Sequence, residues 1–322
     1  MMFMFDRVLT RRRTALAATS LLLGTALAGC GSSASDDDDR VQVLASFYPL
    51  QYVAEQIGGD LVNVTSLTPA GAEPHDLELS PAHARSVGEA DLVVYLSDFQ
   101  PAVDDAIAAR EPEHVVDAAA AADLESHGDD ERADDERVEE TEEEHAEHDH
   151  GALDPHFWLD PERLAAVAAD VETQLAAVDP ENADTYAERA DELVASLTDL
   201  DTRLSDGLAR CTDRVVVTSH EAFGYLADKY DFELVGIAGI DPDTEPSPAR
   251  LREVSDVIEE NGVSTIYLES LVSSKVTDTL AADLGVKTAV LDPLEGLTDP
   301  ETDYRSVMLT NLDVLRAGQG CA

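Results

Sequence analysis

From residue 41 onward the sequence alternates short runs rich in Val, Leu and Ile with stretches whose apolar residues recur at helical spacing. This alternation is typical of parallel β-sheets covered by their connecting helices. It occurs twice along the chain. The expected strands are 41–46, 61–68, 91–97 and 114–119 in the first set, and 214–219, 232–239, 264–269 and 287–292 in the second. We therefore predict an α/β protein with two parallel-sheet lobes.

A largely helical stretch separates the two sets of strands. We expect one helix over 161–177 and a longer one over 180–208, where leucines recur at helical spacing. The longer helix would act as a rigid connector between the lobes. Because ligands commonly bind in clefts at domain interfaces, we expect the binding site in the cleft between the lobes.

The sequence divides into consecutive segments of different character. They are a signal peptide at 1–30, a tether at 31–40, an N-terminal α/β lobe at 41–122, an acidic His-rich loop at 123–151, the end of the N-terminal lobe at 152–179, a linking helix at 180–209, and a C-terminal α/β lobe at 210–322.

Residues 1–30 have the features of an export signal. Arginines at 11–13 precede an apolar run that is too short for a spanning helix with stop-transfer flanks. The run ends in LAGC, which resembles a lipobox, and the arginines resemble a twin-arginine signal. We predict export and lipid attachment at Cys30, which anchors the chain to the outer face of the cytoplasmic membrane. The twin-arginine and general secretion routes both remain open.

The charge of the chain excludes some partners and indicates an environment. Its formal net charge is −47, from 68 acidic against 21 basic side chains, so nucleic acid is a poor partner. Such a charge opposes compaction unless salt screens it, and at molar salt the Debye length falls to about 3 Å. The acidic excess also runs through regular segments such as 179–206. We infer a halophilic source; an acidic protein with one acidic segment is the alternative.

The segment 123–151 is too charged to contribute to a core, and we expect a mobile loop. Its imidazoles offer weak zinc ligands beside carboxylates that concentrate cations. The alternative is a solvated charge run with incidental histidines. The histidines of this loop are His127, His145, His148 and His150.

With Cys30 assigned to lipid attachment, the remaining cysteines are Cys211 and Cys321. An even pair in an exported chain permits a disulfide that ties the C-terminus to the second lobe. Two separate thiols are the alternative, and the sequence leaves both open.

Metal-capable side chains occur near the ends of expected strands and just after the acidic loop. Open parallel sheets bind ligands beyond the carboxyl ends of their strands, so these side chains are candidates to share one site. Three imidazoles and one carboxylate satisfy a tetrahedral zinc ion. The candidate metal ligands are His75, His156, His220 and Asp292. Asp292 precedes Pro293, so a turn or cap role is its alternative.

Several stretches resemble one known family. They are GAEPHDLELSP, DPHFWLDP, TSHEAFGYLADKYDFELVGIAG, DTEPSPARL, STIYLESLVSSKVTDTLAADLG and AVLDPL. Together they resemble the zinc and manganese solute-binding proteins of ABC transporters. The resemblance implies two α/β lobes with a rigid linking helix, little closure on binding, and docking onto a membrane permease powered by a cytoplasmic ATPase. It also implies that the four candidate ligands coordinate the metal, and that Glu73 is a possible auxiliary ligand.

The third ligand favours Zn²⁺ over Mn²⁺. Manganese-type members of the family resemble TSE where this chain has TSH, and imidazole suits zinc better than manganese, which prefers oxygen donors. Glu221, directly after His220, would restore a carboxylate if the alignment shifted by one residue. A manganese or iron binder of the same family is therefore the main alternative.

Two other classes of function are weaker. A surface adhesin has no support from repeats or aromatic patches in the sequence. A zinc hydrolase would need an open coordination position, which a fourth protein ligand closes. We therefore expect a monomeric binding protein and not an enzyme.

Overall fold

The structure, a computed structural model, describes residues 40–127 and 153–322. The described residues belong to one structural unit. The predicted signal peptide and lipidation site at Cys30 lie outside the described residues. So do the loop histidines His145, His148 and His150.

Within the described residues, the first sheet has four parallel strands in the order β2-β1-β3-β4. Alternate residues of its central strands face opposite sides, so Leu44 and Val93 pack on one face while Val43 and Val94 pack on the other. Both faces are therefore apolar, as expected for a parallel sheet covered by helices. The strands are β1 (Val41–Ala45), β2 (Val62–Ser66), β3 (Leu92–Tyr95) and β4 (Val115–Asp117).

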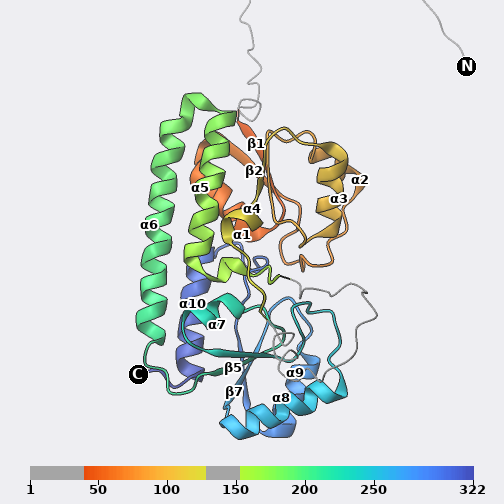
Figure 1. Cartoon of the computed structure of the whole chain (residues 1–322), viewed down its shortest axis with the longest axis vertical. Coiled ribbons are helices and arrows are strands. Elements are labelled where there is room, and N and C mark those ends of the chain that lie inside the picture. The colour runs from red at the N-terminus through yellow and green to blue at the C-terminus, as the bar shows by residue number, and fades with distance from the viewer. Residues whose placement is uncertain (1–39, 128–152) are drawn as a thin grey trace, which may run out of the picture. The chain divides into compact units, whose positions relative to one another are not determined.

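The second sheet repeats this topology further along the described chain, with four parallel strands in the order β6-β5-β7-β8. The prediction of two parallel-sheet lobes is thus confirmed (Figure 1). The strands are β5 (Val215–Thr218), β6 (Glu233–Gly236), β7 (Thr265–Leu268) and β8 (Lys287–Val290).

Local sequence signals explain where several helices begin. Ser80, Asp160 and Ser247 each accept a backbone N–H bond just before a proline that opens a helix. Among the described residues, no helix combines the length and apolar content needed to cross a membrane. Helices of the sheets and their connections are α1 (Tyr48–Gly58), α2 (Pro81–Ser86), α3 (Pro101–Arg110), α4 (Ala118–Ala122), α7 (Gly224–Lys229), α8 (Pro248–Asn261), α9 (Lys275–Leu284) and α10 (Tyr304–Gly318).

Helix α4 differs from the sequence-based expectation. The strand predicted at 114–119 ends at Asp117, whose carboxylate accepts the backbone N–H of Ala119 at 3.1 Å. This bond caps α4, and an alanine run favours a helix once its first turn is capped.

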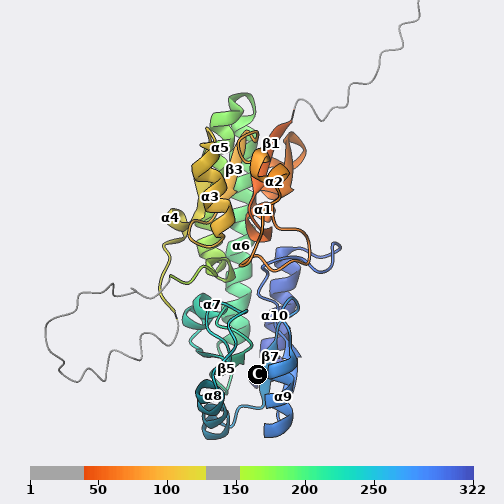
Figure 2. The same ribbon diagram turned by 90° about the vertical axis from the view of Figure 1, so that its right-hand side faces the viewer.

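A pair of long helices connects the two sheets. Helix α5 (Pro161–Val178) packs along α6 (Ala183–Leu208), which also contacts α1 and α10. Figures 1 and 2 show α6 running beside the elements of both lobes. The predicted leucines form its buried stripe, and a short 3₁₀ turn at Pro180–Asn182 precedes it where one continuous helix was expected.

One apolar cluster extends through both lobes. It joins residues of β1, α5 and α6 with residues of α7 and α10. Trp158 lies within it, donating its indole N–H to the Pro293 carbonyl at 2.8 Å and accepting the Tyr304 hydroxyl at its own carbonyl at 2.6 Å. Tyr304 also stacks on Tyr52, with ring centroids 5.3 Å apart. The lobes are therefore joined by a continuous core as well as by α6.

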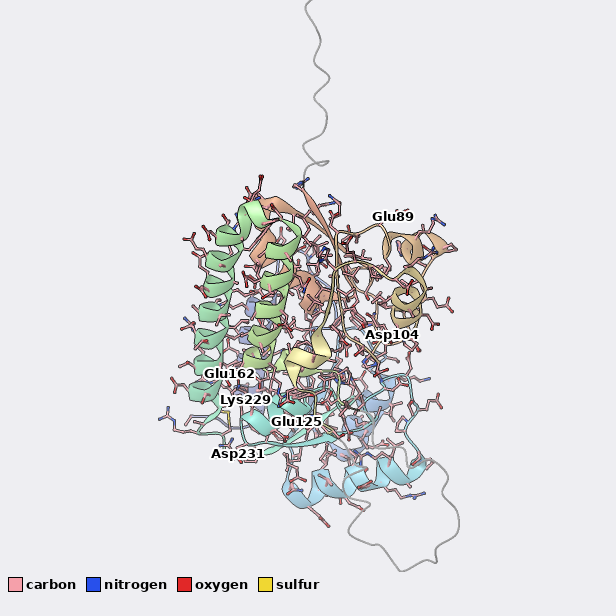
Figure 3. All side chains as sticks on the ribbon, turned by 45° about the horizontal axis from the view of Figure 1, so that its top comes forward. Glu89, Asp104, Glu125, Glu162, Lys229 and Asp231 are labelled. Carbon is pink, nitrogen blue, oxygen red and sulfur yellow. A yellow bond between two sulfur atoms is a disulfide. The ribbon has the colours of Figure 1, made fainter. Side chains whose placement is uncertain are left out.

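The outer surface carries many carboxylates. Glu89, Glu162 and Asp231 are exposed, and Figure 3 labels them on different elements. Some form local ion pairs, such as Glu162 with Lys229 at 2.6 Å. The large acidic excess leaves most such groups without a basic counterpart.

Cys211 and Cys321 form a disulfide that closes a sequence separation of 110 residues. Cys211 is buried directly after α6, and the backbone N–H of Thr212 donates to the Gln319 carbonyl at 3.1 Å. The bond therefore fastens the end of the chain to the end of the linking helix.

Replacing both cysteines, Cys211→Ser with Cys321→Ser, should lower the free energy of unfolding by about 2–5 kcal/mol, because the unfolded chain regains the entropy of a long loop. Urea unfolding at fixed salt measures the loss. Native protein treated with reductant should shift by a similar amount and provides the control. Equal stability of the oxidised, reduced and substituted proteins would contradict a stabilising disulfide.

Candidate metal centre

His75 lies in the loop that follows β2. The Glu73 carboxylate accepts its backbone N–H at 3.0 Å, which closes a tight turn around the residue. Gln100, buried at the start of α3, donates to the Pro74 carbonyl and to the Thr68 hydroxyl, both at 3.0 Å. The ring of Phe99 packs edge-on against the imidazole. These contacts fix the direction of a loop side chain that has no regular element of its own.

His156 is fully buried and precedes a 3₁₀ turn at Phe157–Leu159. Asp154 holds it with one carboxylate oxygen, which accepts the His156 backbone N–H at 2.9 Å and lies 2.7 Å from its Nδ1. Because an ionised carboxylate only accepts hydrogen bonds, Nδ1 carries the proton in this contact. The other nitrogen, Nε2, therefore points away from Asp154 as a metal ligand would.

His220 follows β5 and has an equivalent carboxylate partner. Glu269, just beyond β7, accepts the His220 backbone N–H at 3.0 Å and contacts Nδ1 with its second oxygen. The Thr218 hydroxyl donates to the His220 carbonyl at 2.6 Å. The His220 side chain is fully buried, and its Nε2 also faces inward.

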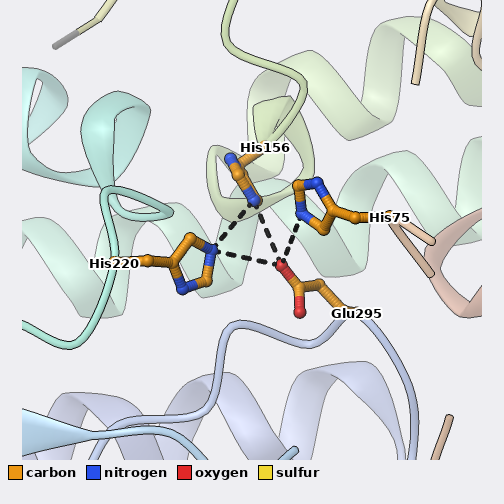
Figure 4. A group of neighbouring side chains, drawn as sticks. All are labelled: His75, His156, His220 and Glu295. Carbon is orange, nitrogen blue, oxygen red and sulfur yellow. Dashed lines mark hydrogen bonds and ion pairs between the residues drawn. The ribbon is translucent and has the colours of Figure 1, made fainter. Parts of the chain in front are cut away.

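Glu295, beyond β8, completes the group (Figure 4). Its Oε1 lies 3.1 Å from Nε2 of His156 and 3.4 Å from Nε2 of both His75 and His220. The four candidate ligand atoms lie within 4.8 Å of one another. Glu295 Oε2 is buried and has no hydrogen-bond partner among the described residues. This convergence and the unpartnered oxygen fit a cation at the centre.

Charges compensate one another within the metal-free group. Burial favours the neutral form of Glu295, but hydrogen bonds from the three imidazoles outweigh it and hold the pKa well below its usual range. Burial also depresses the pKa of His220, yet hydrogen bonds to Glu269 and Glu295 raise it to about 10. Burial lowers the pKa of His156, but the charge of Asp154 and the hydrogen bonds to Asp154 and Glu295 together outweigh burial and raise it. Protons thus occupy the places that a divalent cation would take.

The structure corrects the expected fourth ligand, because it brings Glu295 to the imidazoles in place of Asp292. Asp292 uses one carboxylate oxygen to accept the Leu294 backbone N–H at 2.8 Å and the other to accept the Ser270 hydroxyl at 3.2 Å. It acts as the turn residue that its position before Pro293 also allowed. Leu294 has a positive φ of 60°, and this bend turns the following Glu295 inward.

The remaining sequence candidates lie around the group. Glu73 Oε1 is 3.9 Å from His75 Nε2, close to the centre but outside the four-residue group. Glu221 pairs with Arg250 at 3.0 Å, so it does not replace His220. His127 belongs to a different cluster with Glu125 and Asp228. The sequence analysis did not anticipate Glu295. Its position three residues after Asp292, at the end of an expected strand, was a signal that could have identified it.

Comparison with known proteins gives a consistent assignment. The family model described as the periplasmic zinc-uptake complex component A matches residues 43–318. The high-affinity zinc uptake system protein ZnuA of Bacillus subtilis is 37% identical over 302 residues, which cover 90% of this chain and 92% of that protein. The zinc-binding lipoprotein AdcA of Streptococcus pneumoniae is 33% identical over 297 residues, covering 88% of this chain and 57% of that longer protein.

Solved structures agree with the fold. The zinc-bound AdcA of Streptococcus pneumoniae has a TM-score of 0.70 at 30% identity, covering 87% of this chain and 58% of that one. The laminin-binding protein of Streptococcus agalactiae, described as an adhesin with metal-transporting activity, has a TM-score of 0.74 at 28% identity, covering 87% and 99%. On the family match and these relatives, the chain belongs to the family of periplasmic zinc-uptake complex component A.

Proposed function

We propose that this chain captures zinc outside the cytoplasmic membrane and delivers it to an ABC uptake permease. The observation that carries the proposal is the buried convergence of three imidazole nitrogens and one carboxylate oxygen from segments of both lobes. This donor set suits zinc, and its imidazole majority disfavours manganese. The names of the relatives, a zinc uptake protein and a zinc-binding lipoprotein, support the same cargo.

The proposed ligands are His75, His156, His220 and Glu295. Four protein donors complete a tetrahedral shell and leave no position for an activated water, so we propose no catalytic step. Asp154 and Glu269 hold two of the imidazoles with Nε2 directed inward, which lowers the cost of ordering the site when the ion arrives. Glu73 remains a possible auxiliary donor.

The route and location of the chain are part of the proposal. Residues 1–30 direct export, Cys30 carries the lipid, and residues 31–40 act as a tether, so that a monomer is anchored at the outer face of the membrane. The lipoprotein name of a relative supports this placement. The partner is a membrane permease driven by a cytoplasmic ATPase. The lobe boundaries 41–122 and 210–322, the remaining predicted boundaries, and weak zinc binding by the loop 123–151 are also proposed.

Substitution of the fourth ligand should separate Glu295 from Asp292. Glu295→Gln should weaken zinc binding by more than about 100-fold, because loss of a residue that only supports a ligand already costs about 10–100-fold. Asp292→Asn should weaken zinc binding by only about 10–100-fold. The exposed control Glu301→Gln should bind zinc as tightly as the native protein. Competition with a chromophoric chelator measures the affinities. Native zinc affinity in Glu295→Gln would overturn this ligand set, and a metal analysis of protein purified without added metal tests the cargo.

Zinc binding should release protons and strengthen as pH rises. His220, with its pKa raised to about 10, is an imidazolium at neutral pH, whereas a zinc ligand must be a neutral imidazole. The affinity should therefore rise up to about tenfold per pH unit for each proton displaced. Calorimetry in buffers of different ionisation enthalpy counts the protons, and His220→Gln should release fewer. An affinity that stays constant between about pH 6 and 8 would contradict this charge arrangement.

We also propose that the chain is adapted to high salt. Its net charge of −47 predicts that dilution of potassium chloride from about 1 M to about 0.1 M lowers the thermal midpoint, because carboxylate repulsion becomes unscreened. Sucrose added at matched osmolality is the control and should not restore the midpoint fully. A midpoint that does not depend on salt would remove the halophilic assignment.

A further inference from the structure

The carboxylate of Asp154 is shared between two imidazoles. Its Oδ1 holds Nδ1 of His156, and its Oδ2 lies 2.8 Å from Nδ1 of His127. Asp154 is fully buried, so both contacts form away from solvent. By accepting both Nδ1 protons, one carboxylate sets the same tautomer in both rings. His127 therefore has its Nε2 directed away from Asp154, as His156 does.

The second ring nitrogen of His127 faces two further carboxylates. Its Nε2 lies 3.0 Å from Asp228 Oδ2, at the end of α7, and 4.0 Å from Glu125 Oε2. The candidate ligand atoms of these three residues lie within 4.8 Å of one another. Arg163 pairs with the other oxygen of Glu125 and so holds this carboxylate in place. The group combines one nitrogen and two oxygen donors, which suits a divalent cation such as zinc.

The surrounding packing is built around His127. Gly224 lies so close that a Cβ there would come within 2.6 Å of both the His127 ring and Asp154 Oδ2. The Tyr225 ring packs edge-on against the imidazole, with centroids 4.4 Å apart. The Tyr225 hydroxyl donates to the Asp154 carbonyl and accepts the Glu125 backbone N–H, both at 2.8 Å. Residues from three segments therefore orient the cluster, unlike a chance gathering of surface acids.

We propose that Glu125, His127 and Asp228 form a second divalent-cation site at the start of the acidic loop, with zinc as its ligand. It shares Asp154 as an orienting carboxylate with the buried centre. Glu125 and Asp228 are exposed, so the ion keeps water in its shell and exchanges readily. The site is independent of transport: it requires only that these three side chains bind the ion. A fixed imidazolium paired with carboxylates is the competing arrangement.

Zinc titration distinguishes the two arrangements. The full chain carries His145→Gln, His148→Gln and His150→Gln, so that these loop histidines cannot contribute, and calorimetry follows zinc added after the first equivalent. We expect a second, weaker equivalent. His127→Gln or Asp228→Asn in this background should abolish it and leave the first equivalent unchanged. The matched control His83→Gln, on the exposed face of α2, should retain both.

Each outcome decides the proposal. Absence of a second equivalent in the background protein, or its survival in His127→Gln or Asp228→Asn, would overturn the second site. Asp228 is exposed, so Asp228→Asn remains informative if His127→Gln fails to fold. Asp154→Asn should weaken both equivalents, because one carboxylate serves both rings. If the background protein lacks the first, tight zinc equivalent but keeps the second, weaker one, the result contradicts the buried zinc centre and supports the second site.

Discussion

The contact of one buried carboxylate with three imidazoles determines the organisation of this protein. Glu295 and His220 follow strands of the second sheet, whereas His75 and His156 come from segments that follow the first, so the site exists only when both lobes are in place. Buried charges are costly unless they are compensated, and His156 and His220, whose pKa values are raised, offset the carboxylate while protonated. A divalent ion supplies the same compensation with one particle. Ion binding therefore exchanges one form of neutralisation for another at a preformed centre.

Carboxylates behind the ligands determine the direction of the site. Asp154 and Glu269 each bind the backbone N–H and the Nδ1 of the histidine that they support. This double contact fixes ring orientation and tautomer together. The backbone N–H of the histidine holds the carboxylate in place, so rotation of the imidazole would break the bond between Nδ1 and that carboxylate. The acidic composition of the chain is thus used inside the molecule as well as at its surface.

The fold and three of the four grouped side chains followed from the sequence, for identifiable reasons. Alternating apolar runs predicted every described strand of both sheets, and the signal is strongest in the central strands β1, β3, β5 and β7, whose residues are mostly buried. His220 lies at the end of a strand whose position the pattern fixed, and His156 lies between the acidic loop and the predicted helix at 161–177. The choice between Asp292 and Glu295 depended on a bend at Leu294, which has a positive φ that no local residue preference predicts. The contact of Asp154 with His127 joins residues from separate segments and needed the three-dimensional structure.

The apolar cluster that passes through both lobes bears on how a bound ion leaves. Trp158, Tyr304 and Tyr52 connect the lobes through packed rings and buried hydrogen bonds, and a wide swing between lobes would break them together. Release of the ion through a local backbone change would break fewer contacts. Leu294 holds a backbone conformation that non-glycine residues rarely adopt, and its relaxation towards an extended form would withdraw Glu295 without separating the lobes. A partner that moves this short segment would release the ion while the two lobes stay in place.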